Sequence, residues 1–301
     1  MRRGIAVTAA IIMAGGMLVA CATARPMPEP PGALPAPTET VTAGAEYGTG
    51  MSGPGPFVIR YDGTELHLAP VTYCYGNACV DGVDEDPPSV GSPDELLVFV
   101  PVAGFDSLHV GQVEGDDYCT GRSVEAEVVD LGDGWWSVRP RGEAADYRVD
   151  LFAGGEGSGD MAATLRWSTP ADAPLPEPVA SLALIADHDG EPDSYGLELT
   201  VGNLAAPPEE YAATITVTAA NGASTTIEAE PVTDCLPPGS LSFDGPDDEA
   251  LAASRLGDFP FTYEVTLTLD GETHHALAVF PDDVDVEHGV AVPLEFAPAL
   301  P

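Results

Sequence analysis

The strongest constraint on the fold is a strict alternation of apolar and polar residues with a period of two. Residues 261–269 place five apolar side chains on one face and three threonines with a glutamate on the other, and residues 211–217 repeat the pattern. Successive side chains of a β-strand point to opposite sides, so this alternation predicts strands with one buried face. The only segment that suits a helix is short and lies near residues 248–256.

Similar short runs continue from residue 57 to the end of the chain, separated by Gly, Pro, Asp and Asn. In the first half they predict strands at residues 65–71, 96–100, 107–113, 124–131, 135–138, 147–152 and 162–167. Four prolines between Thr169 and Pro178 then indicate a linker. We therefore expect an all-β chain with two tandem immunoglobulin-like β-sandwich domains, at residues 57–170 and 179–301, joined by a linker at 171–178.

Residues 21–56 have a different composition. Eight prolines lie between Arg25 and Phe57, with Gly, Ala and Thr among them. Proline fixes φ and lacks the backbone N–H donor, which favours an extended chain of about 3.1 Å per residue. The segment is predicted to be a disordered tether that reaches on the order of 100 Å.

The first 20 residues carry a signal for export. Arg2 and Arg3 precede an apolar run from Ile5 to Val19, which is too short and too rich in Gly and Ala to span a bilayer. This pattern is typical of a secretory signal peptide that is cleaved from the mature protein.

Residues 18–21, Leu-Val-Ala-Cys, resemble the lipobox of bacterial lipoproteins, and the resemblance is confined to the first 21 residues. It implies that Cys21 receives a diacylglyceryl group, that cleavage occurs before Cys21, and that the new N-terminus is acylated. The expected location is the cell membrane, lipid-anchored and facing the extracytoplasmic side, since two or three acyl chains anchor stably where one does not. The alternative is an ordinary signal peptide with Cys21 unmodified.

The charge of the chain disfavours two classes of partner. All ten cationic residues are Arg, and removal of Arg2 and Arg3 leaves eight against 49 Asp and Glu. Nucleic acids and anionic headgroups both attract cations, so the sequence predicts no nucleic acid partner and membrane contact through the lipid anchor alone. Salt adaptation, divalent cation binding and plain solubility remain alternative reasons for the acidity.

Four cysteines remain after Cys21, and an even number in an extracytoplasmic protein favours disulfides. Cys74 and Cys79 flank a turn-forming tetrapeptide, which favours a local bridge between them. Cys119 and Cys235 are then left, and their pairing would join the two domains. Free thiols and a different set of bridges are the alternatives, and zinc is disfavoured because the spacing of Cys74 and Cys79 is not that of a usual zinc cluster.

No cofactor is predicted except calcium, for which several acidic clusters are candidates because this ion takes six to eight oxygen ligands. Asp187, Asp189 and Asp193 come nearest to a calcium loop. Pro192 stands where an EF-hand requires glycine, so the favoured interpretation of the segment is an Asp-Gly hairpin turn.

A candidate ligand surface combines aromatic and cationic residues. Alternation on the strand at 135–138 places Trp136 and Val138 inward and Trp135 outward, together with two arginines that follow it. The surface comprises Trp135, Arg139, Arg141, Arg148 and Arg166. Such residues stack on a sugar ring and bind a carboxylate or phosphate, although pairing of the arginines with Glu143, Asp146 and Asp150 is the favoured alternative.

Catalytic motifs are absent from the sequence. There is no His-Glu-x-x-His and no Gly-x-Ser-x-Gly, and Ser-x-x-Lys is impossible without lysine. His274 and His275 are adjacent on a predicted strand and must face opposite ways. The sequence favours a non-enzymatic binding or structural module at the cell surface, with a cell-wall polymer or an envelope protein as partner; a calcium-binding protein or an accessory to a cell-envelope enzyme is the alternative.

Overall fold

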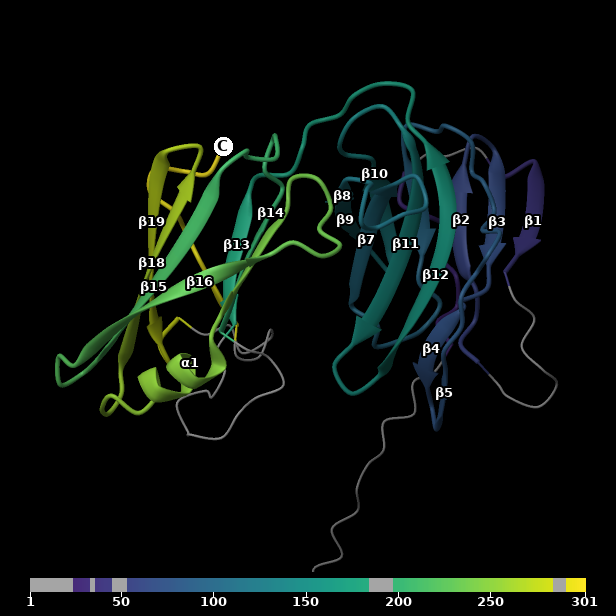
Figure 1. Cartoon of the computed structure of the whole chain (residues 1–301). Helices are drawn as coiled ribbons and strands as arrows, with labels where there is room; N and C mark the ends of the chain where they lie inside the picture. The colour runs from purple at the N-terminus through teal and green to yellow at the C-terminus, as the bar shows by residue number, and fades with distance from the viewer. Residues whose placement is uncertain (1–23, 33–35, 45–52, 184–196, 284–290) are drawn as a thin grey trace, which may run out of the picture.

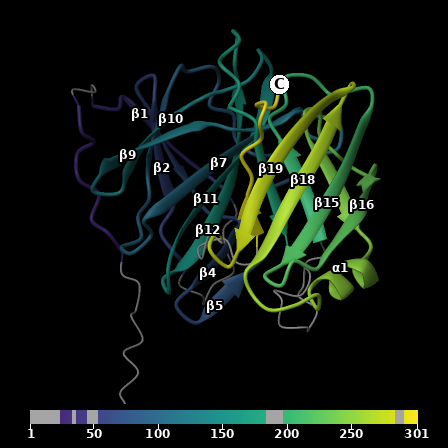
Figure 2. The ribbon, with the colours of Figure 1, turned by 90° about the vertical axis from the view of Figure 1, so that its left-hand side faces the viewer.

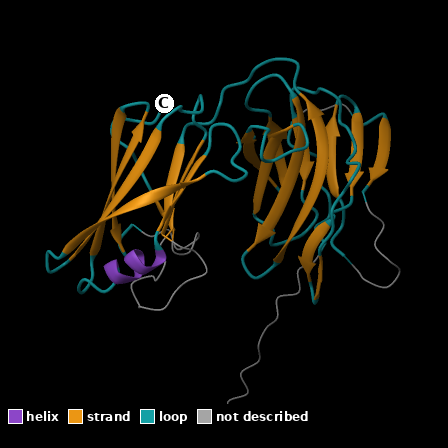
Figure 3. Ribbon diagram, in the orientation of Figure 1, coloured by secondary structure: helices purple, strands orange, loops and turns teal. Residues whose placement is uncertain are grey.

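The computed structural model describes residues 24–32, 36–44, 53–183, 197–283 and 291–301. These residues are nearly all strand, with one short helix, so the all-β prediction is confirmed (Figure 3). The two most regular alternations form strands β15 (Tyr211–Ala219) and β18 (Phe261–Leu269), which pair with each other in antiparallel register. None of the helices in the described part of the chain has the length and apolar character needed to cross a bilayer.

The first part of the chain forms two sheets of six strands (Figure 1). One has the order β1-β3-β2-β6-β10-β9 and the other the order β5-β4-β12-β11-β7-β8. The first sheet contains β1 (Glu39–Ala43), β3 (Thr64–Leu68), β2 (Phe57–Tyr61), β6 (Leu96–Phe99), β10 (Trp135–Arg139) and β9 (Glu127–Gly132). The second contains β5 (Ala78–Val80), β4 (Thr72–Tyr75), β12 (Gly159–Ser168), β11 (Asp146–Gly155), β7 (Ser107–Glu114) and β8 (Ser123–Glu125).

One core lies between these two sheets. The alternate residues Ile59, Val98 and Val138 of the first sheet pack in one buried cluster with Val149 and Trp167 of the second. The indole N–H of Trp167 donates to the carbonyl oxygen of Pro93 at 2.9 Å, so its polar group is satisfied inside the core.

Two parts of the segment expected to be a tether, residues 24–32 and strand β1, contact the first sheet. Ala24 forms a β-bridge with Val102, and β1 pairs in parallel with β3 over five residues. We call residues 24–32 the N-terminal strap. The strap covers an apolar patch on the outer face of the sheet, where Trp135 donates its indole N–H to the carbonyl oxygen of Pro28 at 2.9 Å. Proline content predicted an extended chain, but an extended chain can also lie along a sheet.

The second part of the chain forms a sheet of eight strands in the order β19-β18-β15-β16-β17-β14-β13-β20. Strand β16 pairs with β15 through its first six residues and with β17 through its last three residues, so it passes from one layer to the other. Besides β15 and β18 these strands are β19 (Glu272–Phe280), β16 (Ser224–Val232), β17 (Leu241–Gly245), β14 (Leu197–Gly202), β13 (Val179–Ala183) and β20 (Ala291–Pro293). Their inward residues, among them Leu199, Phe243, Ile215 and Val265, form a buried cluster of their own.

The predicted helix is present as α1 (Asp247–Ala253). It begins after Pro246 and carries three acidic residues in its first turn. Their negative charges interact favourably with the positive, N-terminal end of the helix dipole. Figure 2 places α1 at the end of strands β15, β16, β18 and β19. Ala250 and Ala253 are buried against the core, so packing holds this short helix in place.

Contacts between distant parts of the chain join the two cores. The sulfur atoms of Cys119 and Cys235 are 1.93 Å apart, and those of Cys74 and Cys79 are 2.09 Å apart. Arg122 is 8 % exposed and donates to the carbonyl oxygens of Leu204 at 2.9 Å and Ala205 at 3.1 Å. The favoured local bridge is therefore present, and the pairing left open by the sequence joins β7–β8 to β16–β17.

Tyr147 stabilises the turn before β11 and gives the fold a dependence on alkaline pH. Its hydroxyl donates to the carbonyl oxygen of Glu143 at 2.7 Å, and burial, followed by the charges of Glu114 and Glu143, raises the pKa of Tyr147 to about 12. The unfolded chain ionises near pH 10, so stability from this group is complete below that pH and is lost as the pH rises toward about 12. We expect Tyr147→Phe to lower the free energy of unfolding by about 1 kcal/mol at neutral pH. The variant should also lose less stability than the wild type when the pH becomes alkaline.

Thermal melting of both proteins at neutral and alkaline pH measures this effect. The difference in Tm between wild type and Tyr147→Phe is expected to shrink as the pH rises through the tyrosine range, because the variant lacks the ionising group. A constant difference would mean that Tyr147 does not titrate differently in the two states.

Candidate functional site

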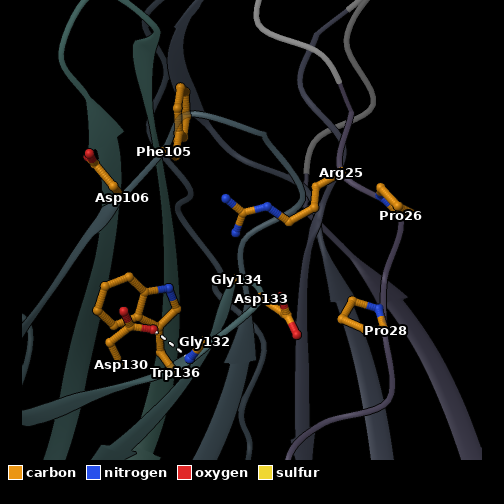
Figure 4. A pocket seen from close by; sticks show the side chains of 10 residues that line it. All are labelled: Arg25, Pro26, Pro28, Phe105, Asp106, Asp130, Gly132, Asp133, Gly134 and Trp136. Atoms are coloured by element: carbon orange, nitrogen blue, oxygen red, sulfur yellow. Dashed lines mark hydrogen bonds between the residues drawn. The ribbon is translucent and has the colours of Figure 1, made fainter.

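The candidate site is a hollow of about 530 Å³ at one end of the first two sheets, within the size range of small-molecule sites (Figure 4). Three segments that are distant in sequence line it. They are the N-terminal strap, the connection between β6 and β7, and the hairpin of β9 and β10. The lining residues are Arg25, Pro26, Pro28, Phe105, Asp106, Asp130, Gly132, Asp133, Gly134 and Trp136.

The β9–β10 turn positions the aromatic residue of the site. Asp133 and Gly134 have φ angles of 54° and 85°, the left-handed conformation that an Asp-Gly turn supplies. The ladder between β9 and β10 shifts register between Trp135 and Trp136, as at a β-bulge. The two rings then lie on opposite sides of the strand, and Trp136 lines the hollow.

Trp136 carries a polar group without a partner. Its ring packs at the margin of the core between the sheets, and its Nε1 atom is buried, with no hydrogen-bond acceptor among the described residues. A buried indole N–H usually finds an acceptor, and leaving this hydrogen bond unmade costs free energy. An oxygen in the hollow would satisfy it once the side chains that bury the atom move apart.

Arg25 lies across the hollow from Trp136. In Figure 4 the guanidinium group of Arg25 and the indole ring project into the same space, with Phe105 at its edge. A side chain at position 134 would overlap the guanidinium group, so Gly134 permits this approach. Among the described residues Arg25 has no ion-pair partner, which leaves its donors available to a ligand.

The charge of the hollow is acidic overall. Asp106, Asp130 and Asp133 line it together with the single cation Arg25, and Asp130 already accepts the backbone N–H of Gly132 at 2.8 Å. Carboxylates disfavour an anionic ligand but accept hydrogen bonds from hydroxyl groups. Aromatic rings, one guanidinium group and several carboxylates together suit a neutral molecule with many hydroxyl groups.

The predicted ligand surface is not assembled as expected. Alternation placed Trp135 correctly on the face away from the main core, but the N-terminal strap covers that face, and Trp135 is 0 % exposed. Strand β10 belongs to one sheet, whereas β11 and β12 belong to the other. The arginines of the two sheets therefore do not form one continuous ligand surface.

The four arginines of that surface are engaged separately. Arg139 pairs with Glu95 at 3.0 Å, and Arg166 pairs with Asp116 at 2.8 Å. Arg148 lies 3.9 Å from Asp150, whereas the backbone of Arg141 is held by the side chain of Gln112. Carboxylates do pair with Arg139, Arg148 and Arg166, but of the three partners named from the sequence only Asp150 is among them.

The remaining predicted site residues give no second site. Cys21 and the calcium candidates Asp187, Asp189 and Asp193 lie outside the described residues. Within the described ranges no group of three His, Cys, Asp or Glu side chains is placed to hold a metal ion. His274 and His275 face opposite ways as predicted, since His274 is 1 % exposed and His275 contacts Thr266 at the surface.

A second hollow, of about 790 Å³, lies along strands β13, β14 and β17. Its lining is apolar or hydroxyl-bearing and contains no charged side chain. It lacks the convergent polar groups that give a ligand site its specificity. The hollow beside Trp136 is therefore the stronger candidate.

Sequence reasoning missed Arg25 and Phe105 as site residues. Arg25 stood in a proline-rich segment that indicated a tether, and Phe105 lies in a connection without regular pattern. The Asp133-Gly134 pair before Trp135 is a local sequence signal for the turn that positions Trp136. No known protein family matches the chain, and no curated protein sequence matches it significantly.

Proposed function

We propose that the protein is a non-enzymatic binding module, anchored to the extracytoplasmic face of the cell membrane through acylated Cys21. The signal peptide pattern of residues 1–20 and the Leu-Val-Ala-Cys sequence support the anchor. Two cysteine pairs at disulfide distance support an oxidising compartment. The scarcity of cations argues against binding to nucleic acid.

We also propose that its two parts are tandem immunoglobulin-like sandwiches. Such a domain has strands A, B, E and D in one sheet and C, F and G in the other, with C′ added beside C in some types. The orders β2-β6-β10-β9 and β12-β11-β7-β8 fit this scheme, as do β13-β14-β17-β16 and β19-β18-β15-β16. Tyr147 supports it further, because its position at the start of β11 and its bond to Glu143 are those of a tyrosine corner.

The ligand that best fits the hollow is a neutral oligosaccharide, such as a segment of a cell-wall polymer. The observation that carries this proposal is the buried, unpartnered Nε1 of Trp136, which faces the same hollow as the free guanidinium group of Arg25. Sugar rings stack on aromatic faces, and their hydroxyl groups both donate to carboxylates and accept from N–H groups. The three aspartates disfavour a uronic acid or phosphate in this position.

Binding of the full-length protein to arrayed cell-wall oligosaccharides, neutral, N-acetylated and uronic-acid-containing, tests this proposal. We expect neutral and N-acetylated sugars to bind and acidic ones not to bind. Trp136→Phe keeps the ring but removes the N–H, and should weaken binding about tenfold; Trp136→Ala should abolish it.

Arg139→Ala is the matched control, since Arg139 is exposed at the far end of the same strand and does not line the hollow. Its affinity should equal that of the wild type, and melting curves verify that each variant is folded. Binding of no sugar, or equal losses in Arg139→Ala and Trp136→Ala, would contradict the proposed site.

A further inference from the structure

The N-terminal strap fixes the chain to the fold immediately after the proposed anchor. Ala24 bridges Val102, the backbone N–H of Arg25 donates to the carbonyl oxygen of Pro101, and Pro28 accepts from Trp135. Pro30 is buried, although the residues around it are exposed. The strap is therefore held by hydrogen bonds to the first sheet and by the burial of Pro30.

This arrangement limits the distance between the fold and an acyl group on Cys21. Three peptide links separate Cys21 from Ala24, and they span at most about 11 Å when fully extended. The expected reach for a tether of 21–56 was on the order of 100 Å. The bilayer must then lie close to whichever end of the protein carries Ala24.

That end is the one that carries the candidate site. Val102 and Phe105 belong to the β6–β7 connection, which lies beside the β11–β12 turn because Gly104 and Gly155 approach each other closely. In Figure 1 the β11–β12 turn and the β4–β5 hairpin lie at the lower end of the first sheets. The chain leaves β12 for the second part of the protein at the upper end (Figure 1).

We infer that the end of the first two sheets formed by the β6–β7 connection, the β9–β10 turn and the N-terminal strap lies against the lipid bilayer. The inference rests on the proposed acylation of Cys21. The hollow beside Trp136 then opens next to the membrane, and its ligand is presented at the membrane surface. The part of the chain after residue 178 joins at the opposite end.

Electrostatic attraction does not produce this contact. Asp106, Asp130 and Asp133 outnumber Arg25 at this end, so anionic headgroups repel it slightly. Only the short covalent connection between the acylated Cys21 and Ala24 holds this end of the protein against the bilayer. The contact is therefore expected on neutral vesicles as well as on anionic ones.

Energy transfer from tryptophan to a dansyl-labelled lipid headgroup measures the distance. The chain has three tryptophans, and two of them, Trp135 and Trp136, lie at the proposed membrane end. Trp167 lies near the C-terminal end of β12, away from the β11–β12 turn and from the bilayer. The lipidated full-length protein is incorporated into phosphatidylcholine vesicles. Transfer should be efficient and should not increase when phosphatidylglycerol is added.

The deciding variant has twenty Gly and Ser residues inserted between Thr23 and Ala24. It adds about 25 Å of mean reach, so transfer should fall by about half or more. The matched control has the same insertion after Pro301, which lengthens the chain without changing the anchor, and it should transfer like the wild type.

Two failures are distinguishable. Mass spectrometry that finds Cys21 without acyl chains, or protein that does not stay with the vesicles, would overturn the proposed anchor. Acylated, vesicle-bound protein whose transfer is the same with and without the insertion at residue 23 would leave the anchor in place and overturn this inference.

Discussion

Trp135→Ala is expected to lower the free energy of unfolding by about 3–5 kcal/mol, the usual cost of removing a buried tryptophan ring. The ring is 0 % exposed and lies 5.2 Å from the ring of Phe99, centroid to centroid. The guanidinium carbon of Arg60 lies 5.3 Å from the centroid of the same ring. Urea unfolding of wild type and variant measures the loss.

One milder substitution at this position and one at the neighbouring tryptophan serve as comparisons. Trp135→Phe keeps an aromatic ring but loses the bond to Pro28 and part of the packing, so we expect a smaller loss than for alanine. Trp136→Ala removes a half-buried ring at the margin of the core and should also cost less.

The same variants report on the N-terminal strap. Amide hydrogen exchange at Arg25 should accelerate in Trp135→Ala, because the strap loses its contact with the sheet. A Trp135→Ala protein as stable as the wild type, with slow exchange at Arg25, would indicate that Trp135 is a surface residue, as the sequence alone suggested.

Replacing both Cys119 and Cys235 by serine is expected to lower the free energy of unfolding by about 5 kcal/mol. The reason is that a cross-link over 116 residues removes much of the entropy of the unfolded chain. The matched control is the double replacement of Cys74 and Cys79, which are 5 residues apart. The same loop-entropy relation gives about 2 kcal/mol for that bridge. The longer bridge should therefore contribute more than twice as much.

Unfolding of both double variants in urea, without reductant, tests this ordering. Arg122 still joins the two parts in the Cys119 and Cys235 variant through the carbonyl groups of Leu204 and Ala205, so each part is expected to remain folded in dilute buffer. Equal losses for the two bridges, or a larger loss for Cys74 and Cys79, would contradict the entropic account.

Local pattern predicted much of the fold. The alternation at 211–217 and 261–269 gave two strands that pair with each other, and the short helix appeared where it was expected. Alternation also gave the correct sides for Trp135 and Trp136. These predictions succeed because the direction of a side chain on a strand depends only on the backbone of that strand.

Exposure, by contrast, depends on what the rest of the chain places over a face. Trp135 was expected to be exposed because nothing near it in sequence covers it, yet the residue that accepts its N–H lies 107 positions away. The candidate site has the same origin, since Arg25 and Trp136 become neighbours only when the strap folds back. The proline-rich composition of the strap gave no sign of this, because extended chain in solution and extended chain on a sheet have the same local conformation.

The sequence by itself therefore determined the all-β class, the strand faces, the local Cys74–Cys79 bridge and the charge that disfavours nucleic acids. Only the tertiary structure decided the Cys119–Cys235 pairing, the burial of Trp135, the separation of Arg139 from Arg148 and Arg166, and the assembly of the hollow beside Trp136. The physical reason is range: side-chain alternation is set within a few residues, whereas burial and site geometry arise from contacts between segments about 100 residues apart.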